Sequence, residues 1–598
     1  MLKRSIQKSL FTICPIRSHI QCTTRKGIRI FIPRTPMKLQ KLQIKNFRGI
    51  TDLELNFGET TVLIGENNTG KTAVLDAIRF ALRDVRSRRG CAFNSYDFHL
   101  PNATSEPASA AAISIRLTFG EKTPGEWDDQ QTARLNRAKI AQVDTNGCTS
   151  VILKVGAQFD PVAQDFIQDW EFQNLTGAAL ANVPDSALLT LQNEVSYYYL
   201  AALRDAAKHF DAKGSFWRPF LKESQLTAEK RAEIEAKLSE VNQLIISSHA
   251  SFAQVVDRLK EVQQVLSMAG GEEVVSVDAV PGRLFDMLAK AQVNLNAGTG
   301  AKIPVGRHGE GMQSLAVLTL FNAFLQTWNK GTPIVALEEP ESHLHPSAVR
   351  ALWKLIERMP GQKIISTHSG DLLSEVPSES IIRLYSKSGV IIPKGMREIP
   401  LDDKKRRQFN YHIRHARGEL LFARCWILGE GETEVTLFPE LARILGKDLE
   451  RNGIRCIAYR QSDISLFTKI AEAMGIQWIA IIDNDTQGKV DQRKVRKALG
   501  ARPENDVLFV MPEDDIEQHL CASGFTYIYK EFLSPQLGAN IKVTETDPEY
   551  FKGLTKAVAE HKIPAVHTVL TEIRNGTNSA PPLFTSVIDA AIKWANLS

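Results

Sequence analysis

Several common features are missing from this sequence. It has no pair of cysteines at the C-x-x-C spacing, and its seven cysteines are scattered along 598 residues. This usage indicates reduced thiols inside a cell and argues against a disulfide framework or a cysteine-rich zinc site. There is also no apolar run long enough to span a bilayer. We therefore expect a cytoplasmic protein with no membrane partner.

Acidic residues are absent before Asp52, whereas residues 1–36 contain eight lysines and arginines. Taking those eight from the 73 lysines and arginines of the chain leaves 65, against 68 acidic residues. The rest of the chain is not globally basic, so contact with nucleic acid would need a local basic patch. The basic leader suits an organelle transit peptide or, as we favour, residues that precede a true start at Met37.

The length of the chain suggests about three domains. The spacing of its apolar residues indicates which elements each part contains. Lys41–Ile44 and Leu53–Phe57 alternate polar and apolar residues, which predicts a strand hairpin. Ala228–Met268 has apolar residues at three- and four-residue steps, which predicts a helical hairpin. Residues 387–407 are polar and contain prolines, and are typical of a linker. From Cys425 onward strands alternate with helices, which predicts a parallel sheet.

The clearest motif is Gly65-Glu-Asn-Asn-Thr-Gly70-Lys71-Thr72, which matches the P-loop pattern and stands between a predicted strand and a predicted helix. Its glycines allow backbone N–H groups to approach phosphates, Lys71 would reach the β- and γ-phosphates, and the Thr72 hydroxyl would hold Mg²⁺. The sequence therefore predicts an ATP site whose cofactor-binding residues include Gly65, Asn67, Asn68, Gly70, Lys71 and Thr72.

A second part of this site is expected where an apolar strand, Ile334–Leu337, ends in two acids. Glu338 would complete the Mg²⁺ shell at the nucleotide, and Glu339 would polarise the attacking water. Aspartate is the usual residue at the first position, so Glu338 is a mild departure from the pattern.

Five segments together resemble the ABC-type ATPase of the SMC/RecF group: Asn46–Arg48, the P-loop, Gly309–Ser314, Glu338–Pro346 and Ile364–Ser369. The resemblance implies that His368 is the switch histidine. It also implies that Gly311 and Ser314 belong to a signature motif that contacts the nucleotide of the opposite subunit. We therefore expect a homodimer or a higher homo-oligomer.

A separate acid-rich stretch follows, Gly429-Glu-Gly-Glu-Thr-Glu-Val435. Glu430 ends a predicted strand, and Glu434 lies one helical turn later. Asp483 and Asp485 stand at the end of another strand, and the carboxyl ends of parallel strands are where ligands bind. Four carboxylates at one edge would repel each other unless cations lie between them, and such oxygen ligands suit Mg²⁺ or Mn²⁺. Two ions of this kind hydrolyse phosphodiesters.

Strand–Glu-Gly-x-x-Glu–helix followed by strand–Asp-x-Asp resembles the Toprim pattern of topoisomerases, primases and certain nucleases. The resemblance implies one more acidic ligand after the Asp-x-Asp motif. Glu517 fits this role best, and Asp514 and Asp515 are the alternatives. The metal ligands are thus predicted to be Glu430, Glu434, Asp483, Asp485 and Glu517.

An SMC/RecF-like ATPase fused ahead of a Toprim domain resembles the OLD (overcoming lysogenization defect) family of nucleases. That family carries a functional lysine in its last helical region, and here Lys562 fits better than its rival Lys556. The catalytic residues implied are Glu339 and His368 for ATP hydrolysis, and Glu430, Asp483 and Lys562 for cleavage.

The expected fold is α/β: an ABC-type P-loop ATPase with a helical dimerisation insert, followed by a Toprim α/β domain. We place the leader at 1–36, the first part of the ATPase at 37–165 and a mostly helical insert at 166–290. The second part of the ATPase follows at 291–395 and the Toprim domain at 396–598.

The resulting hypothesis is an ATP-regulated, divalent-metal-dependent endonuclease that nicks or cuts DNA. The family resemblance adds a role in prokaryotic anti-phage defence and a partner protein of a defence system. Two alternatives stay open. One is an SMC-like DNA clamp whose Toprim domain is not catalytic. The other is a topoisomerase-like enzyme, for which the sequence offers no placed tyrosine nucleophile; Tyr197–Tyr199 are expected to pack in the core.

Overall fold

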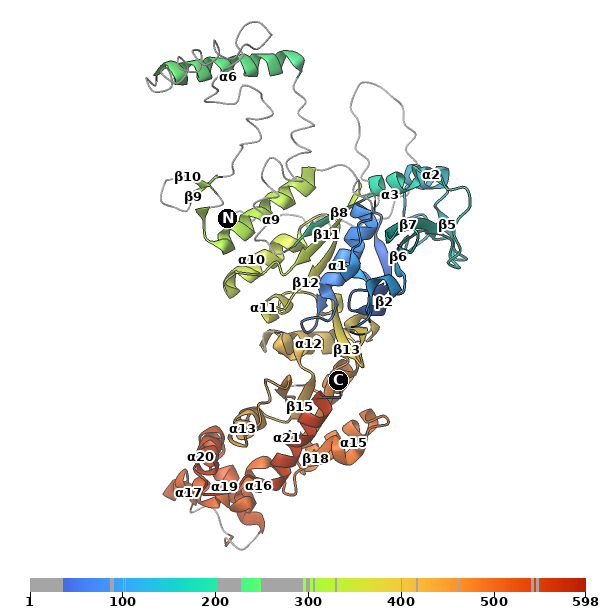
Figure 1. The fold of residues 1–598 in the computed structure, drawn as a ribbon. Coiled ribbons are helices and arrows are strands. Elements are labelled where there is room, and N and C mark those ends of the chain that lie inside the picture. Colours follow the sequence, from blue (N-terminus) through green and yellow to red (C-terminus); the bar gives the residue numbers. More distant parts are fainter. Residues whose placement is uncertain are drawn as a thin grey trace, which may run out of the picture.

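The computed structural model describes residues 36–85, 91–201 apart from 101 and 103, 227–248, 294–296, 302–304, 307–327, 331–399, 401–415, 418–460, 462–538, 543–544 and 548–597. The predictions for the leader and for the returning half of the helical hairpin lie outside these ranges. The described parts form two bodies joined at a waist, with the ATPase half above and the Toprim half below in Figure 1. No helix within the described ranges is long and apolar enough to cross a membrane.

The first sheet is antiparallel, with strand order β2-β1-β4-β6-β5 and β7 added beside β6. The predicted hairpin is confirmed, because β1 pairs with β2 through a two-residue turn in which Arg48 has a φ of 52°. The strands are β1 (Leu39–Phe47), β2 (Ile50–Asn56), β4 (Ile113–Gly120), β5 (Gln142–Val143), β6 (Thr149–Asp160) and β7 (Asp165–Gln173).

The second sheet has the order β14-β13-β3-β12-β11-β8 and is parallel except for β14. Helix α1 (Lys71–Arg79) packs on one face, while α9 (Glu310–Thr327) and α10 (Pro346–Glu357) pack on the other. The two motif-bearing strands, β3 and β11, lie on either side of β12, so the P-loop and the paired acids meet at one edge. The strands are β3 (Thr60–Ile64), β8 (Val195–Leu200), β11 (Thr332–Glu338), β12 (Gln362–Ser366), β13 (Ile381–Lys387) and β14 (Val390–Gly395).

The predicted boundary between the ATPase and its insert at residue 165 is wrong. Strand β7 pairs with β6, and β8 pairs in parallel with β11, so the first part of the ATPase continues to Leu200. Tyr197 and Tyr199 pack in the core as expected, while Tyr198 turns to the opposite face against α9. Among the described insert residues, α6 (Ala228–Ser248) is helical as predicted. Its dimerisation role stays a prediction.

The predicted linker at 387–407 is also wrong. Residues 390–395 form β14, an edge strand. Pro393 has no N–H to donate, but at the edge of the sheet this removes no hydrogen bond between central strands. Helix α12 (Asp403–His415) follows and buries Phe409 and Ile413. The polar composition reflects an edge strand and a half-exposed helix rather than an unstructured connection.

The third sheet is parallel, as predicted, with the order β16-β15-β17-β18. Helices α14 and α15 cover one face, and α13 with the C-terminal helices covers the other. The strands are β15 (Cys425–Gly429), β16 (Ile454–Ala458), β17 (Gln477–Ile482) and β18 (Leu508–Val510). The helices are α13 (Glu432–Ile444), α14 (Ile464–Met474), α15 (Thr486–Ala498), α16 (Ile516–Leu520), α17 (Thr526–Glu531), α18 (Pro535–Gly538), α19 (Pro548–Ala557), α20 (Lys562–Arg574) and α21 (Pro582–Ala595).

A buried arginine joins the two halves. Arg383 on β13 is 3% exposed, and its guanidinium donates to the carbonyl oxygens of Met474 (3.1 Å), Gly475 (2.9 Å) and Ala423 (3.0 Å). Tyr385, two residues further on, lies so close to Gly475 that an added Cβ would be 2.5 Å from its ring. The Toprim domain is therefore fixed to the ATPase sheet through its own backbone.

Replacing Arg383 with leucine should lower the free energy of unfolding by about 3 kcal/mol or more, because three carbonyl groups lose their donor. The loss should appear as an earlier transition in urea, followed by circular dichroism. Arg358→Leu, at an exposed position after α10, is the matched control and should shift the midpoint little. Equal midpoints for the two variants would contradict this account of the junction.

Candidate active sites

The P-loop has the backbone shape that its sequence predicts. Gly65 has φ 149°, and a Cβ there would lie 2.2 Å from the Leu384 carbonyl oxygen, so a side chain is excluded. Gly70 has φ 85° and begins α1. Lys71 Nζ donates to the carbonyl oxygens of Gly65 (2.9 Å) and Glu66 (2.7 Å). Burial lowers the pKa of Lys71 to about 8.

The remaining P-loop residues take two different positions. Asn67 and Asn68 are exposed at the tip of the loop, and Asn68 has φ 66°. The Thr72 hydroxyl donates to Glu338 Oε1, which links the end of β11 to the first turn of α1. Thr72 and Glu338 are therefore placed together as the sequence predicts for a Mg²⁺-nucleotide site.

Tyr199 is a site residue that sequence reasoning missed. Its hydroxyl donates to Glu338 Oε2 at 2.5 Å, and burial followed by the contact with Glu338 raises its pKa. The side chain comes from β8, which lies 139 residues before Glu338 in the chain. The pairing of β8 with β11 brings them together, and no local sequence signal marks it.

Glu339 and His368 face each other across the ends of β11 and β12. Their closest atoms, His368 Nε2 and Glu339 Oε1, are 3.7 Å apart. Glu339 has φ 44°, an unusual backbone for a residue that is not glycine. Burial and the nearby Lys71 charge lower the pKa of His368, which favours its neutral form. This arrangement fits the predicted water-polarising acid and switch histidine.

The signature segment begins α9. An added Cβ at Gly311 would lie 3.0 Å from the carbonyl oxygen of His343, and Ser314 is 4% exposed. His343 Nδ1 lies 3.1 Å from Glu310 Oε2. The motif thus packs against the turn that follows the paired acids. Its contact with a nucleotide on a second subunit stays a prediction.

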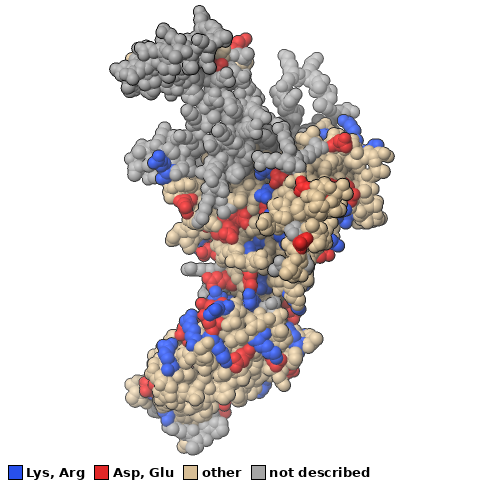
Figure 2. All heavy atoms as spheres, viewed as in Figure 1, with Lys and Arg blue, Asp and Glu red and all other residues tan. Residues whose placement is uncertain are grey.

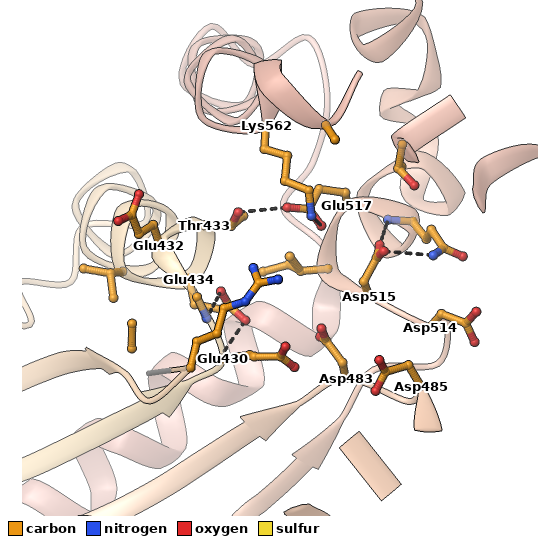
Figure 3. Close-up of a pocket in the computed structure, with 18 of the residues that line it drawn as sticks. Glu430, Glu432, Thr433, Glu434, Asp483, Asp485, Asp514, Asp515, Glu517 and Lys562 are labelled. Atoms are coloured by element: carbon orange, nitrogen blue, oxygen red, sulfur yellow. Dashed lines mark hydrogen bonds and ion pairs between the residues drawn. The ribbon is translucent and has the colours of Figure 1, made fainter. Parts of the chain in front are cut away.

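The acid-rich stretch lines a cavity of ≈ 1310 Å³ in the Toprim half. Figure 3 shows acids from several elements around it, with Glu432 turned away from the others. All five predicted metal ligands line this cavity: Glu430, Glu434, Asp483, Asp485 and Glu517. The parallel pairing of β15 with β17 places Glu430 and Asp483 beside each other at the carboxyl ends of the strands.

Two carboxylate oxygens in this cavity are buried without a hydrogen-bond partner, Glu430 Oε2 and Asp483 Oδ1. Burial, then Glu434 and Glu430, raise the pKa of Asp483 to about 9. Burial, then Asp485, raise the pKa of Glu430. Buried carboxylates are normally paired or bound to metals. The pair therefore fits a divalent cation, which would satisfy both oxygens and oppose their repulsion.

The other three predicted ligands already have partners. Glu434 is 3% exposed and accepts the backbone N–H groups of Glu430 and Gly431, both at 3.1 Å. Asp485 caps α15 by accepting the N–H of Gly488 at 2.6 Å. Across the described ranges, no three acidic, histidine or cysteine side chains already converge as a set of metal ligands. The five acids thus share a cavity but not a common point.

On one wall, the buried Glu517 forms an ion pair with the partly exposed Lys562. Lys562 Nζ donates to Glu517 Oε2 at 2.9 Å, and Thr433 Oγ1 donates to Glu517 Oε1 at 2.8 Å. Burial lowers the pKa of Lys562, but Glu517 raises it further, so it ends above its usual value. Lys562 points toward the acids in Figure 3. Its rival Lys556 also lines the cavity, but no described side chain binds it there.

Glu517 is the buried member of its acidic segment. Asp515 caps α16 through the N–H of Gln518, and Asp514 accepts Lys552 Nζ at 2.9 Å on the rim. Further lining residues, among them Tyr411 and Arg460, were not predicted. Tyr411, which is 50% exposed, reaches the cavity from α12, and Arg460 reaches it from the end of β16. Nothing in their local sequence connects them with the acids.

Two family models match the chain. A family described as "Protein of unknown function (DUF2813)" matches residues 37–419, and the "Overcoming lysogenization defect protein-like, TOPRIM domain" matches residues 421–485. The second match begins just before β15 and ends at Asp485, so it spans the strands that carry Glu430 and Asp483.

Curated relatives match over most of their length. The uncharacterized protein YbjD of Escherichia coli is 27% identical, covering 92% of this chain and 97% of its own. Endonuclease GajA of Bacillus cereus is 24% identical, covering 78% of each chain. The OLD nuclease of Thermus scotoductus is 26% identical, covering 76% of this chain and 83% of its own. The chain therefore belongs to the DUF2813 family, and a Toprim domain of the OLD type follows its P-loop half.

Proposed function

We propose that this protein is an ATP-regulated, divalent-metal-dependent endonuclease that cleaves DNA. The observation that carries the proposal is the pair of buried, partnerless carboxylate oxygens of Glu430 and Asp483 in the acid-lined cavity. Relatives named endonuclease GajA and OLD nuclease support it. A role in antiviral defence and a partner protein of a defence system, which the family resemblance of the sequence implies, are part of the proposal.

Glu430 and Asp483 would hold the cation, with Glu434, Asp485 and Glu517 available once they exchange their present partners. Bound there, Mg²⁺ or Mn²⁺ would lower the pKa of an attacking water and neutralise charge on the leaving oxygen. Lys562, held by Glu517, would place a positive charge beside the scissile phosphate. The protein's own groups thus supply binding, orientation and charge.

In the ATPase half, Lys71 would leave the Gly65 and Glu66 carbonyl groups to bind the phosphates of ATP. Thr72 and Glu338 would hold Mg²⁺, and Glu339 would orient the water. His368 faces Glu339 and would respond to the presence or absence of the γ-phosphate of ATP. A second subunit would complete the site through Gly311 and Ser314, so the active form is proposed to be a homodimer or larger.

A topoisomerase-like activity is the second candidate, because the structure places Tyr411 in the wall of the acid cavity. That chemistry needs a tyrosine nucleophile and leaves a covalent protein–DNA intermediate. The endonuclease is favoured because Lys562 and the acids form the cavity without requiring Tyr411. Reactions of the wild-type protein and of the Tyr411→Phe variant are stopped with denaturant and tested for DNA linked covalently to protein. Linked DNA that is present with the wild type and lost in the variant would indicate the topoisomerase-like activity.

The two sites should be separable by mutation. Asp483→Asn should reduce cleavage of supercoiled plasmid in Mn²⁺ by at least about 100-fold, because losing even an outer-shell partner costs 10–100-fold, while phosphate release from ATP persists. Lys71→Ala should abolish phosphate release and retain some nicking. Glu339→Gln should bind ATP and hydrolyse it slowly. Full cleavage by both Asp483→Asn and Glu430→Gln would show that the cavity is not the nuclease site.

Lys562 and Lys556 provide a matched pair at one cavity. Lys562→Ala should slow plasmid cleavage by about 100-fold or more, because it removes the cation that Glu517 holds beside the acids. Lys556→Ala should change cleavage only a few-fold. Single-turnover rates at saturating DNA measure both. A larger loss in the Lys556 variant would reverse the assignment.

The raised pKa of Asp483 predicts how stability depends on pH. The unfolded carboxyl loses its proton near pH 4, whereas the folded one keeps it until about pH 9. The folded state therefore binds more protons between these values, and the contribution of this group to stability falls as pH rises. Without divalent cations, Tm should be about 2–4 °C lower at pH 8 than at pH 6.

Adding Mn²⁺ should recover more of this Tm at pH 8 than at pH 6, since the cation replaces the proton. Asp483→Asn should flatten the pH dependence and remove the Mn²⁺ response, as measured by differential scanning fluorimetry. Asp403→Asn, an exposed position on α12, is the control. An Asp483→Asn variant with the wild-type response to Mn²⁺ would contradict a cation site at Asp483.

A further inference from the structure

Helix α15 presents a stripe of exposed cations. Lys489, Arg493 and Lys497 are spaced four residues apart and are all exposed, so they follow one face of the helix. The opposite face is buried and includes Val495 and Gln492. With a rise of 1.5 Å per residue, the stripe is about 12 Å long. We call these three residues the α15 stripe.

The stripe differs from the other basic residues nearby, which are paired. Lys494 binds Asp491 and Asp463, and Arg496 binds Glu504. Within the described parts of the chain, the three stripe residues have no hydrogen bond or ion pair from their side chains. Acidic partners thus neutralise the other cations of the helix, whereas the three stripe residues stay exposed to solvent.

The stripe is continuous with the acid cavity. Asp485, whose carboxylate lines the cavity, is the N-cap of α15, and Lys489 one turn later lines the same cavity. Lys556 and Arg460 are exposed cavity residues on other elements. Figure 2 shows Lys and Arg side chains gathered on the part of the Toprim half nearest the waist. The rim of the cavity therefore carries exposed lysine and arginine side chains as well as exposed acids such as Glu432 and Glu560, and the stripe continues from its cations along α15.

We propose that the α15 stripe binds the phosphate backbone of duplex DNA where the duplex leaves the acid cavity. This inference rests on the proposed function and adds the path of the substrate. Unpaired lysine and arginine side chains neutralise phosphates without reading bases. Single-strand sites add aromatic side chains on which bases stack, and α15 contains no aromatic residue. The stripe therefore suits duplex DNA of any sequence.

The test is binding of a short fluorescent duplex, measured by anisotropy in EDTA from 50 to 200 mM KCl. The variant changes Lys489, Arg493 and Lys497 to glutamine. For this variant, the slope of log K against log[salt] should be less negative by about 2–3, because each lost phosphate contact removes about 0.9 from the slope. Affinity near 100 mM salt should fall at least about 10-fold.

Two controls separate the stripe from general charge and from folding. Lys122, Arg137 and Lys139 are exposed on the ATPase half, and changing them to glutamine removes the same charge far from α15. That variant should keep the wild-type slope. Exchanging lysine and arginine at the three stripe positions keeps the charge and should also keep the slope. Thermal melts should be equal for all variants.

A stripe variant with the wild-type slope and affinity would overturn the proposal, and the stripe would then be an ordinary solvated helix face. Tighter binding of a single strand than of the duplex would also overturn it. Because EDTA prevents cleavage, the result does not depend on nuclease activity. A wild-type protein that binds DNA through the stripe but cuts no plasmid would refute the proposed endonuclease and leave the stripe as a DNA-binding surface.

Discussion

The two halves of this protein act as one body because of a buried guanidinium. Arg383 leaves the ATPase sheet and donates to three backbone carbonyl groups of the Toprim half. Backbone acceptors cannot change rotamer, so the contact fixes the start of β15 and the end of α14 relative to β13. The hydrophobic core is also shared, since Val62 and Trp426 belong to one buried cluster. Strands β15 and β17, which end at Glu430 and Asp483 in the Toprim cavity, begin next to this junction.

The same junction brings the nucleotide site close to the Toprim domain. Glu66, inside the P-loop, forms a two-bond ion pair with Arg424, the residue before β15. His368, the proposed switch histidine, stacks on Phe422 with ring centroids 6.5 Å apart and an interplanar angle of 18°. Two groups at the nucleotide site thus contact a three-residue segment that enters the strand carrying Glu430. This short route is the physical basis of the proposed regulation of the cavity by ATP.

The local sequence pattern predicts most of the acids that line the cavity, but it does not predict which of them already accept hydrogen bonds. Glu430 and Asp483 were predicted because acids after parallel strands share one edge of a sheet. Asp485 and Glu434 were predicted as metal ligands, and in the structure their oxygens accept hydrogen bonds from the N–H groups of helix starts. The sequence pattern is the same for a capping acid and for a metal-binding acid. Only the hydrogen bonds distinguish them.

The sequence by itself determined the motifs and their order: the P-loop, the paired acids after β11, and the acids after β15 and β17. These are local, since each depends on a strand end and the few residues beyond it. Tertiary structure alone decided that Tyr199 binds Glu338 and that Glu517 pairs with Lys562. These contacts join segments far apart in the chain, and their partners are selected by packing and burial, which no local spacing records.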